Sequence, residues 1–576
     1  MQVEEIIKSA TLEKHEKGSA AQKISDFYKN ILDIEGRNKL GITPIKPYLD
    51  MIDKAESADS LTEINTTLQK ELCLAPFAAF SLTVDFKDST KYIPVFDVYE
   101  PFLTKDFYIS GTESQKSAYF KCLKTLIELS GETADDAKID KFYEFEKSLA
   151  EKMLSTEDKN NVDKFYNTFS PQEIQTMLPI IDTDKILVTD VGLVKEFASL
   201  STNENLDMLK FAAKLSVISG YGGTFSSAFT DASDAFNQEF FGISGKYSDE
   251  ERAAINVASF MSDYIGKLYA EKHFTQESKQ DVLNMIKDIL AVFKSRIDRL
   301  DWMSSETKEM AKSKLDKMSV KIGYPNEWST YLDNAEIKSV SEGGSYFENV
   351  LSIAKAARSD LKGIQGTSSD KTKWIIYPHM ANACYIATSN DITFPAAILQ
   401  SPLYDVSASY EENLGGIGYV IAHEITHAFD NNGAKFDENG NASDWWNSQD
   451  YAEFENLCEK IVNFYDGSEA ITGIPMNGRL TLSENVADQG AVQCITEVAS
   501  KLDNPDYKTL YRSMAKNWAS TKTREYAQYA AAVDVHSDEK LRVNRVVVNC
   551  DEFYSAFGIG ESDGMWVSPQ DRVKIW

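Results

Sequence analysis

The stretch Ile421-Ala-His-Glu-Ile-Thr-His-Ala-Phe429 decides how the rest of the chain is interpreted. It contains His423-Glu-x-x-His427, and residues four apart on a helix share one face, so both imidazoles can point at one metal ion. Glu424, next to the first histidine, can reach a water molecule on that ion. The pattern therefore predicts two zinc ligands and a general base for hydrolysis, and the alternative is an amphipathic helix with incidental histidines.

The third zinc ligand must come from another segment, because a hydrolytic zinc site has three protein ligands and leaves the fourth position open. Some families place a glutamate about twenty residues after the second histidine, but Trp446 and Asn447 stand there. The extended H-E-x-x-H-x-x-G-x-x-H pattern is also absent, because Asp430 replaces its glycine and no third histidine follows nearby. Both arrangements are therefore excluded.

Glu484, within Leu482-Ser-Glu-Asn-Val-Ala-Asp488, is the best candidate for the third ligand. Glu484 and Asp488 are four residues apart, so they lie on one face of a second helix. Glu484 can bind zinc while Asp488 accepts the free N–H of His423, which fixes the tautomer of that histidine. This spacing alone is typical of a solvated helix face, but the apolar Val486-Ala487 between the two acids favours a metal site.

A peptide-cleaving site also needs a hydrogen-bond donor for the oxyanion that forms on the scissile carbonyl. His536, in Asp534-Val-His-Ser537, can supply it while Asp534 orients the ring, and the alternative is a structural histidine. Arg542 follows, and its planar guanidinium suits a carbonyl or carboxylate of a substrate. The far C-terminal part of the chain is thus expected to contribute to the site.

Length, charge and cysteine content limit the class of protein. A chain of 576 residues is too long for one hydrophobic core, so two or more domains are expected. The formal net charge of −29 argues against binding to nucleic acid or to anionic membrane surfaces. Six scattered cysteines without C-x-x-C spacing form neither a disulfide framework nor a cysteine zinc site, and they fit a reducing compartment.

The pattern of apolar residues divides the chain into three regions. Residues 1–325 are predicted to be mostly helical, because apolar stripes recur at helical spacing, for example over 134–154 and 276–300. Residues 326–373 are polar and contain paired glycines, so they are predicted to connect two lobes. Residues 374–576 are predicted to be the catalytic zinc domain.

Local signals in the third region place the zinc motif on a helix. A short strand is expected over 384–387, followed by a turn at 389–391 and a second strand over 392–394. A helix is then expected from about Leu414 through the zinc motif, and 430–433 should end it.

Stretches along the chain resemble, in order, the motifs of one family. In the C-terminal half they are 382–385, 392–400, 423–430, 444–446, 484–488, 542–544 and 571–576, and in the N-terminal half 268–272, 301–308 and 322–325. On these motifs the chain resembles the neprilysin (M13) family of zinc endopeptidases, in its bacterial oligopeptidase (PepO-like) form, over nearly its whole length. Cys384 departs from the pattern by replacing an aromatic residue in the substrate strand.

The resemblance implies a mainly α fold, namely a two-lobed, zincin-type metallopeptidase with a large internal cavity. A small β-sheet is expected to carry the edge strand that binds the substrate. One zinc ion per chain is implied, bound by His423, His427 and Glu484.

The resemblance also implies the roles of the remaining site residues. Glu424 is the general base and later the proton donor, Asp488 orients a ligand, and His536 stabilises the tetrahedral oxyanion. The substrate main chain is held by a second group of residues, which comprises Asn382, the backbone of Ala383, and Arg542. Val420 lies seven residues before His427, so it can line an apolar pocket on the same helix.

The expected function is that of a zinc-dependent endopeptidase that cuts internal bonds of oligopeptides and prefers a hydrophobic residue after the scissile bond. An exopeptidase that releases dipeptides and a catalytically silent binding protein are the alternatives. The chain is expected to be a monomer. A cytoplasmic location is expected, because neither a signal peptide nor a membrane segment is evident. An extracellular location stays open if an N-terminal segment is missing, since the family usually begins with D-F-Y-x-Y-V-N-G-x-W.

Overall fold

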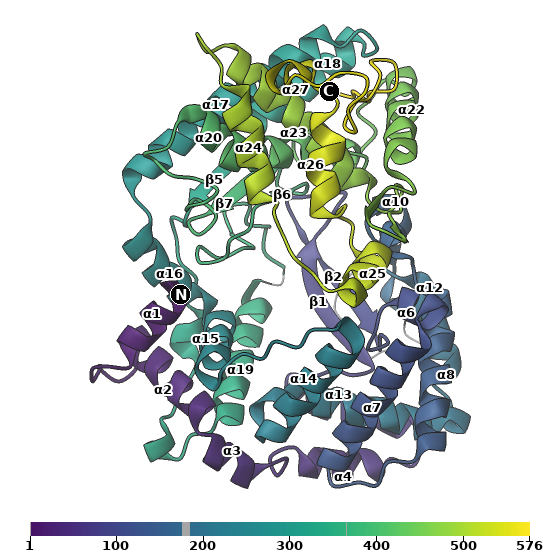
Figure 1. The fold of residues 1–576 in the computed structure, drawn as a ribbon. Helices are drawn as coiled ribbons and strands as arrows, with labels where there is room; N and C mark the ends of the chain where they lie inside the picture. The colour runs from purple at the N-terminus through teal and green to yellow at the C-terminus, as the bar shows by residue number, and fades with distance from the viewer. Residues whose placement is uncertain (1, 175–184, 365) are drawn as a thin grey trace. The chain divides into compact units, whose positions relative to one another are not determined.

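A computed structural model describes residues 2–174, 185–364 and 366–576, and helices make up most of its elements (Figure 1). The predicted mainly α fold is therefore confirmed. The contacts between residues divide the chain into two compact units. Unit 1 contains Met1–Thr83, Tyr92–Ile265 and Trp328–Ser368, and unit 2 contains Val84–Lys91, Gly266–Glu327 and Ser369–Trp576.

This grouping differs from the boundaries predicted at residues 325 and 373. The segment 266–327 packs in unit 2, and most of the predicted connection packs in unit 1, where it contains the helix α19 (Tyr346–Ile364). The domain boundaries drawn from the sequence stay a prediction, as does the large internal cavity.

The elements of each unit have the following bounds. Unit 1 contains the helices α1 (Gln2–Ala10), α2 (Ala20–Leu32), α3 (Ile34–Leu40), α4 (Lys46–Asp53), α5 (Ala58–Glu71), α6 (Lys105–Ser110), α7 (Glu113–Leu129), α8 (Asp136–Lys152), α9 (Thr156–Lys159), α10 (Val162–Phe165), α11 (Pro171–Ile174), α12 (Val191–Leu200), α13 (Leu206–Tyr221), α14 (Ser227–Phe241), α15 (Asp249–Phe260) and α19, with the strands β1 (Ala78–Val84), β2 (Tyr92–Val98), β3 (Asn167–Phe169) and β4 (Ile186–Val188). Unit 2 contains α17 (Gln276–Arg299), α18 (Ser305–Lys317), α20 (Tyr410–Asn413), α21 (Tyr419–Thr426), α22 (Ser448–Tyr465), α23 (Leu482–Ser500), α24 (Tyr507–Asn517), α25 (Arg524–Val533), α26 (Glu539–Val547), α27 (Asp551–Phe557), β5 (Ser319–Gly323), β6 (Cys384–Ile386), β7 (Asp391–Pro395), β8 (Glu469–Ile471) and β9 (Ile474–Pro475). The helix α16 (Ser262–His273) runs from unit 1 into unit 2.

The two long helices that the sequence predicts are present. The stripe over 134–154 forms α8, whose N-cap Asp135 accepts a hydrogen bond from the backbone of Ala137. The stripe over 276–300 forms α17, which is capped by Thr275. Each helix buries the apolar residues at helical spacing, so the periodicity identified the face that packs on a core.

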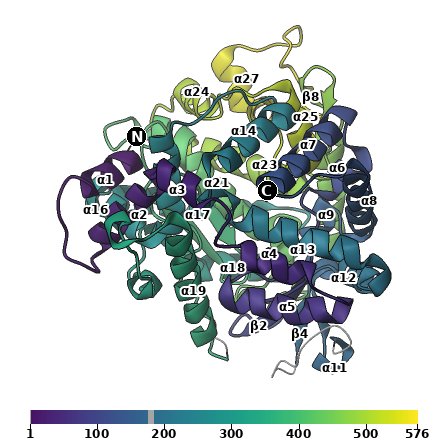
Figure 2. The same ribbon diagram turned by 90° about the horizontal axis from the view of Figure 1, so that it is seen from below.

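Unit 1 also contains a sheet that the helical pattern of its sequence does not predict. Its strand order is β1-β2-β4-β3, in which β2 and β4 run parallel and β3 runs antiparallel to β4. The helix α5 lies beside this sheet (Figure 2), where Asn65 Nδ2 donates a hydrogen bond to Ala78 O at 3.0 Å. The strands β3 and β4 have only three residues each, too few for a periodic signal.

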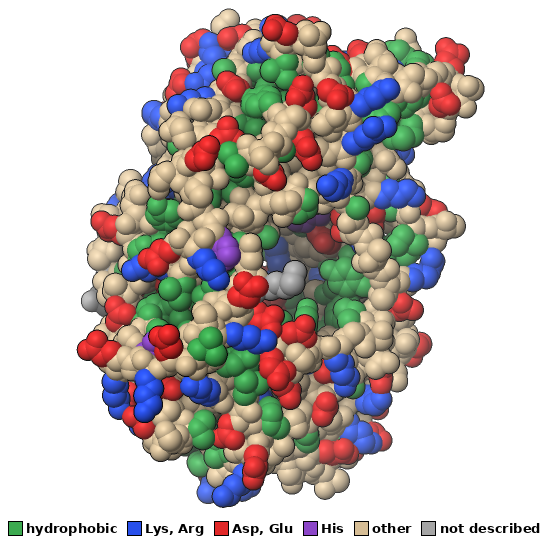
Figure 3. Space-filling model, turned by 60° about the vertical axis from the view of Figure 1, so that its left-hand side comes forward, with side chains coloured by type: hydrophobic (Ala, Val, Ile, Leu, Met, Phe, Trp, Pro, Cys, Tyr) green, Lys and Arg blue, Asp and Glu red, His purple; other side chains and the backbone are tan. Residues whose placement is uncertain are grey.

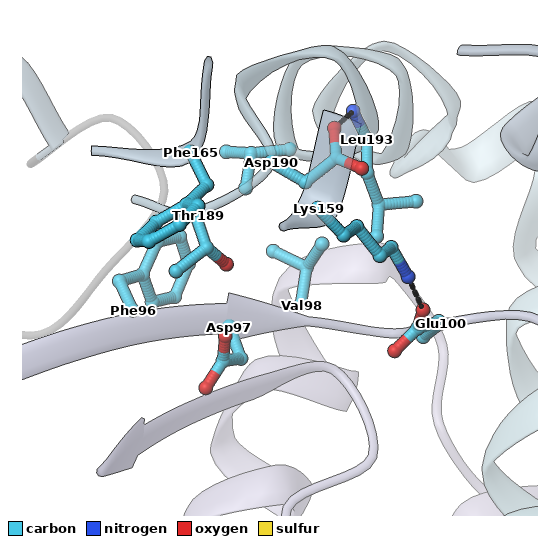
Figure 4. Close-up of a pocket in the computed structure, with 10 residues that line it drawn as sticks. Phe96, Asp97, Val98, Glu100, Lys159, Phe165, Thr189, Asp190 and Leu193 are labelled. Atoms are coloured by element: carbon cyan, nitrogen blue, oxygen red, sulfur yellow. Dashed lines mark hydrogen bonds and ion pairs between the residues drawn. The ribbon is translucent and has the colours of Figure 1, made fainter. Parts of the chain in front are cut away.

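A cavity of about 360 Å³ lies against this sheet (Figure 4). Its lining includes the apolar side chains of Phe96, Phe165 and Leu193. An ion pair between Lys159 and Glu100, 2.6 Å apart, lies at its edge. Among the described residues, the one group of acidic, histidine and cysteine side chains that could hold a metal lies in unit 2 instead.

The three-stranded sheet of unit 2 has the order β5-β7-β6, so β6 is an edge strand, and β8 pairs with β9 in a separate sheet. The central strand β7 is completely buried and pairs parallel with β5 and antiparallel with β6. The predicted strands over 384–387 and 392–394 correspond to β6 and β7. The core that surrounds β7 also includes apolar residues of α17, α21 and α23, so the sheet and the zinc motif share one core.

Acidic and basic side chains are interspersed on the face that Figure 3 shows, without a continuous patch of either charge. No helix within the described ranges combines the length and the apolar character needed to cross a membrane.

Candidate metal centre

The zinc motif lies on a helix whose geometry changes along its length. A π-helical turn over Leu414–Gly418 leads into α21, and a 3₁₀ turn over His427–Phe429 follows. The helical turns end at Phe429, as the sequence predicts. His423 and His427 face each other from successive turns, with their Nε2 atoms 3.0 Å apart.

The helix α23 brings Glu484 to these two histidines. Glu484 Oε2 lies 3.2 Å from His423 Nε2 and 3.6 Å from His427 Nε2. A close approach of the two helices permits this, because a Cβ atom on Gly490 of α23 would lie 2.5 Å from Thr426 Cγ2 of α21. The structure thus brings together three predicted ligands from two segments.

The donor set fits a zinc ion. Zinc–nitrogen and zinc–oxygen distances near 2.0–2.1 Å in a tetrahedron separate neighbouring donors by about 3.3 Å, and the observed separations range from 3.0 to 3.6 Å. Glu484 Oε2 is buried and has no hydrogen-bond partner among the described residues. A bound cation would satisfy this oxygen.

Two carboxylates hold the far sides of the histidine rings. Asp488 Oδ1 lies 2.8 Å from His423 Nδ1, as the sequence predicts. Asp430 Oδ2 lies 2.6 Å from His427 Nδ1. Sequence reasoning missed this contact, because it used Asp430 to exclude another family and to end the helix. The signal was available, since Asp430 is three residues after His427 and follows it by about one turn. Each ring therefore turns its Nδ1 toward a carboxylate and leaves its Nε2 to face the metal site.

Arg542 of α26 is held by Asp488. Arg542 Nε and Nη2 donate to the two carboxylate oxygens at 2.8 and 2.9 Å, and its guanidinium stacks 4.1 Å above the ring centre of Trp518. Burial raises the pKa of Asp488, but the charges of Arg542 and His423 outweigh burial and hold it far below its usual range. The predicted contact between Arg542 and the substrate stays a prediction.

The two glutamates of the site differ in their electrostatics. Burial raises the pKa of Glu484, yet the imidazoles of His427 and His423 outweigh this effect and keep its pKa well below the usual range. Burial also raises the pKa of Glu424, and there it prevails over the attraction of the histidines. Glu484 is therefore kept anionic, whereas Glu424 binds a proton more readily than an exposed glutamate.

His536 lies at the same cluster, although 52 residues separate it from Glu484 in the sequence. Its Nε2 lies 3.3 Å from Glu484 Oε2, and its Nδ1 lies 2.9 Å from Asp534 Oδ1. The next residue, Ser537, donates a hydrogen bond to Asn485 Oδ1 at 2.7 Å, so the loop is fastened to α23. The predicted pairing of Asp534 with the His536 ring is present.

The predicted substrate residues lie on or next to elements of unit 2. Asn382 is exposed just before β6, and its Oδ1 accepts a hydrogen bond from the N–H of Ala383 at 2.9 Å. Val420 is half-buried on α21, the helix of His423. Their roles toward a substrate stay predictions.

Two models of peptidase family M13 match the chain, one over residues 1–325 and the other over residues 382–573. The chain belongs to peptidase family M13. A neutral endopeptidase of Lactococcus lactis subsp. lactis is 35% identical to this M13 chain over 395 residues, or 69% of the chain. The chain spans 62% of the length of that relative.

Solved structures match the fold of this M13 chain. The Mycobacterium tuberculosis zinc metalloprotease Zmp1, in complex with an inhibitor, matches with a TM-score of 0.92 and 28% identity, covering 100% of this chain and 92% of that one. PepO from Lactobacillus rhamnosis matches with a TM-score of 0.91 and 26% identity, covering 100% and 94%. The M13 resemblance, in its PepO-like form, and zinc as the metal are confirmed.

Proposed function

We propose that this M13 chain is a zinc-dependent endopeptidase that hydrolyses internal bonds of oligopeptides. The observation that carries the proposal is the convergence of His423, His427 and Glu484 on one point, beside the buried Glu424. The names of the relatives, a neutral endopeptidase and a zinc metalloprotease, support the same class of reaction.

His423, His427 and Glu484 would hold the zinc ion, which would supply a Lewis acid for the attacking water and the scissile carbonyl. Glu424 accepts a proton from that water and later delivers it to the leaving amine. Burial raises the pKa of Glu424, which makes its carboxylate a stronger base toward the water than an exposed glutamate. Asp488 and Asp430 keep the histidine rings oriented while this happens.

His536 donates a hydrogen bond to the oxyanion in this mechanism. Its Nε2 lies 3.3 Å from Glu484 Oε2, so it is next to the proposed ligands. Asp534 accepts the hydrogen of Nδ1 and keeps the ring in place, which lowers the cost of reorganising a donor as negative charge develops.

The substrate is proposed to bind as an additional strand beside β6. An edge strand leaves main-chain groups available, and main-chain hydrogen bonds bind extended peptides with little regard for sequence. Asn382 and the backbone of Ala383, next to this edge, hold the peptide, and Arg542 contacts the residues beyond the scissile bond. Val420 lines an apolar pocket, which favours a hydrophobic residue after the scissile bond.

The test compares wild type with Glu424→Gln, each loaded with zinc, on a ten-residue peptide whose products are identified by mass spectrometry. We expect internal cleavage by wild type, its loss with a chelator, and in Glu424→Gln a full zinc content with turnover lowered by about 10²–10⁴-fold. The matched control Glu455→Gln changes an exposed glutamate of α22 and should cleave normally.

Other outcomes would contradict parts of this proposal. Turnover retained by Glu424→Gln would remove Glu424 as the base. Dipeptides released from one end would identify an exopeptidase, and no cleavage by the zinc-loaded wild type would favour a binding protein. The monomeric state stays a prediction.

A further inference from the structure

Lys314 of α18 is a buried lysine that the proposed mechanism does not use. Its side chain is 1% exposed, and Nζ donates hydrogen bonds to the carbonyl oxygens of Ala428, Gly433 and Phe436 at 2.8, 2.7 and 2.7 Å. All three carbonyls belong to the segment 428–436, which directly follows His427. An ammonium group has three hydrogens, so this cradle uses all of them.

The position of Lys314 is explained by the end of the zinc helix. Ala428 lies in the last helical turn, where carbonyls have no partner within the helix and form the negative end of its dipole, whereas Gly433 and Phe436 belong to the turn that follows. A cation there satisfies them and is attracted to the dipole. The rings of Phe429, Tyr385 and Trp445 lie 5.8–5.9 Å from Nζ, within the range in which an aromatic face attracts a cation.

The helix α18 is itself fastened at its other end. Ser304, its N-cap, donates a hydrogen bond to Asp450 Oδ2 of α22, and Thr307 Oγ1 accepts one from the backbone of Asn447 at 3.1 Å. The N-terminal end of α18 is therefore attached to α22 and the residue before it, and Lys314, near the other end, contacts the segment 428–436.

Asp430 connects this segment to the metal centre. Its Oδ1 accepts hydrogen bonds from the N–H groups of Asn432 and Gly433 at 2.8 and 2.6 Å. Its Oδ2 lies 2.6 Å from His427 Nδ1 and also accepts a hydrogen bond from Ser483, the residue before Glu484. The place of Asp430 thus depends on the turn that ends at Gly433, and Lys314 holds the carbonyl of Gly433.

We propose that Lys314 is a positioning residue for the zinc ion, which holds the segment 428–436 so that Asp430 orients the ring of His427. The inference rests on His427 being a ligand, as proposed above. Lys314 would thus act on the metal site although it precedes Ala428 by 114 positions in the sequence.

The experiment compares the zinc affinity of two lysine variants. Lys314→Met keeps the length of the side chain and removes its donors. The matched control is Lys23→Met, because Lys23 is a buried lysine of unit 1 whose Nζ also donates to two main-chain carbonyls, Leu332 O and Asp333 O. Zinc dissociation constants are measured by competition with a coloured chelator, well below the unfolding temperature of each protein.

We expect Lys314→Met to bind zinc about tenfold more weakly than wild type, at the lower end of the range for outer partners of a metal site. Lys23→Met should lose stability but keep the wild-type zinc affinity. An unchanged affinity in Lys314→Met, or an equal loss in Lys23→Met, would overturn the proposal.

A second variant and a second measurement keep the proposal testable if Lys314→Met does not fold. Lys314→Gln retains fewer donors, and hydrogen exchange is followed in its metal-free form. The amides of Asn432 and Gly433 should exchange faster than in wild type while those of α8 are unchanged, and equal rates would overturn the proposal. The variant His427→Ala distinguishes a failure of the ligand assignment from a failure of the role of Lys314. If His427→Ala keeps zinc, the ligand assignment fails. If His427→Ala loses zinc while the Lys314 variants keep it, only the role of Lys314 fails.

Discussion

Asp488 and Arg542 form a buried, two-pronged ion pair, with nitrogen–oxygen distances of 2.8 and 2.9 Å. The same carboxylate lies 2.8 Å from Nδ1 of His423. One side chain of α23 therefore connects the zinc helix α21 to α26. The guanidinium and the carboxylate are both planar groups and meet through two parallel hydrogen bonds, which a lysine in place of Arg542 would not reproduce.

The first prediction concerns the charge of Asp488. Asp488→Asn keeps the shape of the side chain, but it removes the negative charge and replaces one of the two acceptor oxygens with an N–H donor, which cannot accept a hydrogen bond from Arg542 or His423. Zinc affinity should fall by about 10–100-fold, the usual effect of losing such a partner. Competition with a chelator measures it, and Asp506→Asn, which changes an exposed cap of α24, should match wild type. Equal affinities in all three proteins would show that His423 does not need Asp488.

The second prediction separates the two functions of Asp430. Asp430→Asn keeps Oδ1 as an acceptor for the backbone of Asn432 and Gly433, but it can turn an N–H toward His427. Asp430→Ala removes both functions. We expect both variants to bind zinc more weakly, and only Asp430→Ala to lose about 1–3 kcal/mol of unfolding free energy for its unpaired backbone groups. Urea unfolding of the metal-free proteins measures the difference, and equal losses would contradict this division.

The third prediction is a dependence of stability on pH that arises in unit 1. Burial, followed by the nearby carboxylate of Asp360, raises the pKa of Asp263 to about 6. An unfolded aspartate has a pKa near 3.9, so the folded chain binds the extra proton between about pH 4 and 6. The stability from Asp263 is complete below about pH 4 and is lost as the pH rises through about 6.

Asp263→Asn tests this dependence because the amide has no charge to lose. At pH 7.5 the variant should be more stable than wild type by about 1–2 kcal/mol, after allowing for partial screening by solvent, and at pH 4.5 the gain should be much smaller. Thermal unfolding at both pH values measures the effect. Asp140→Asn, at an exposed position of α8, should show no such dependence. A gain of the same size at both pH values would exclude titration of Asp263 as the cause.

The fourth prediction concerns the part of the chain needed for a folded catalytic unit. Phe293 of α17 stacks on Phe429 with ring centres 5.5 Å apart, and β5 pairs with the buried strand β7. A fragment of residues 374–576 lacks α17, α18 and β5, so it would expose the apolar face that they cover. It should bind a hydrophobic dye and unfold without a cooperative transition, whereas residues 266–576 should unfold more cooperatively. A cooperative transition in the shorter fragment would contradict this.

The sequence by itself determined the features that depend on local spacing. The separation of four positions between His423 and His427 places both rings on one face, because the rise and turn of a helix are constant. The same regularity predicted the long helices α8 and α17 and the end of the zinc helix near residue 430. The resemblance of ordered motifs added the M13 family and zinc, both of which the comparisons confirmed.

Only the tertiary structure decided which distant segments meet. The sequence offered Glu484 as a candidate, but its distance to the histidines depends on how closely α21 and α23 pack, which Gly490 permits. The contact of Asp430 with His427, the cradle around Lys314, the sheet of unit 1 and the packing of 266–327 in unit 2 were not predicted. These features depend on the shared core, where apolar burial selects among many possible neighbours and no local period records the choice.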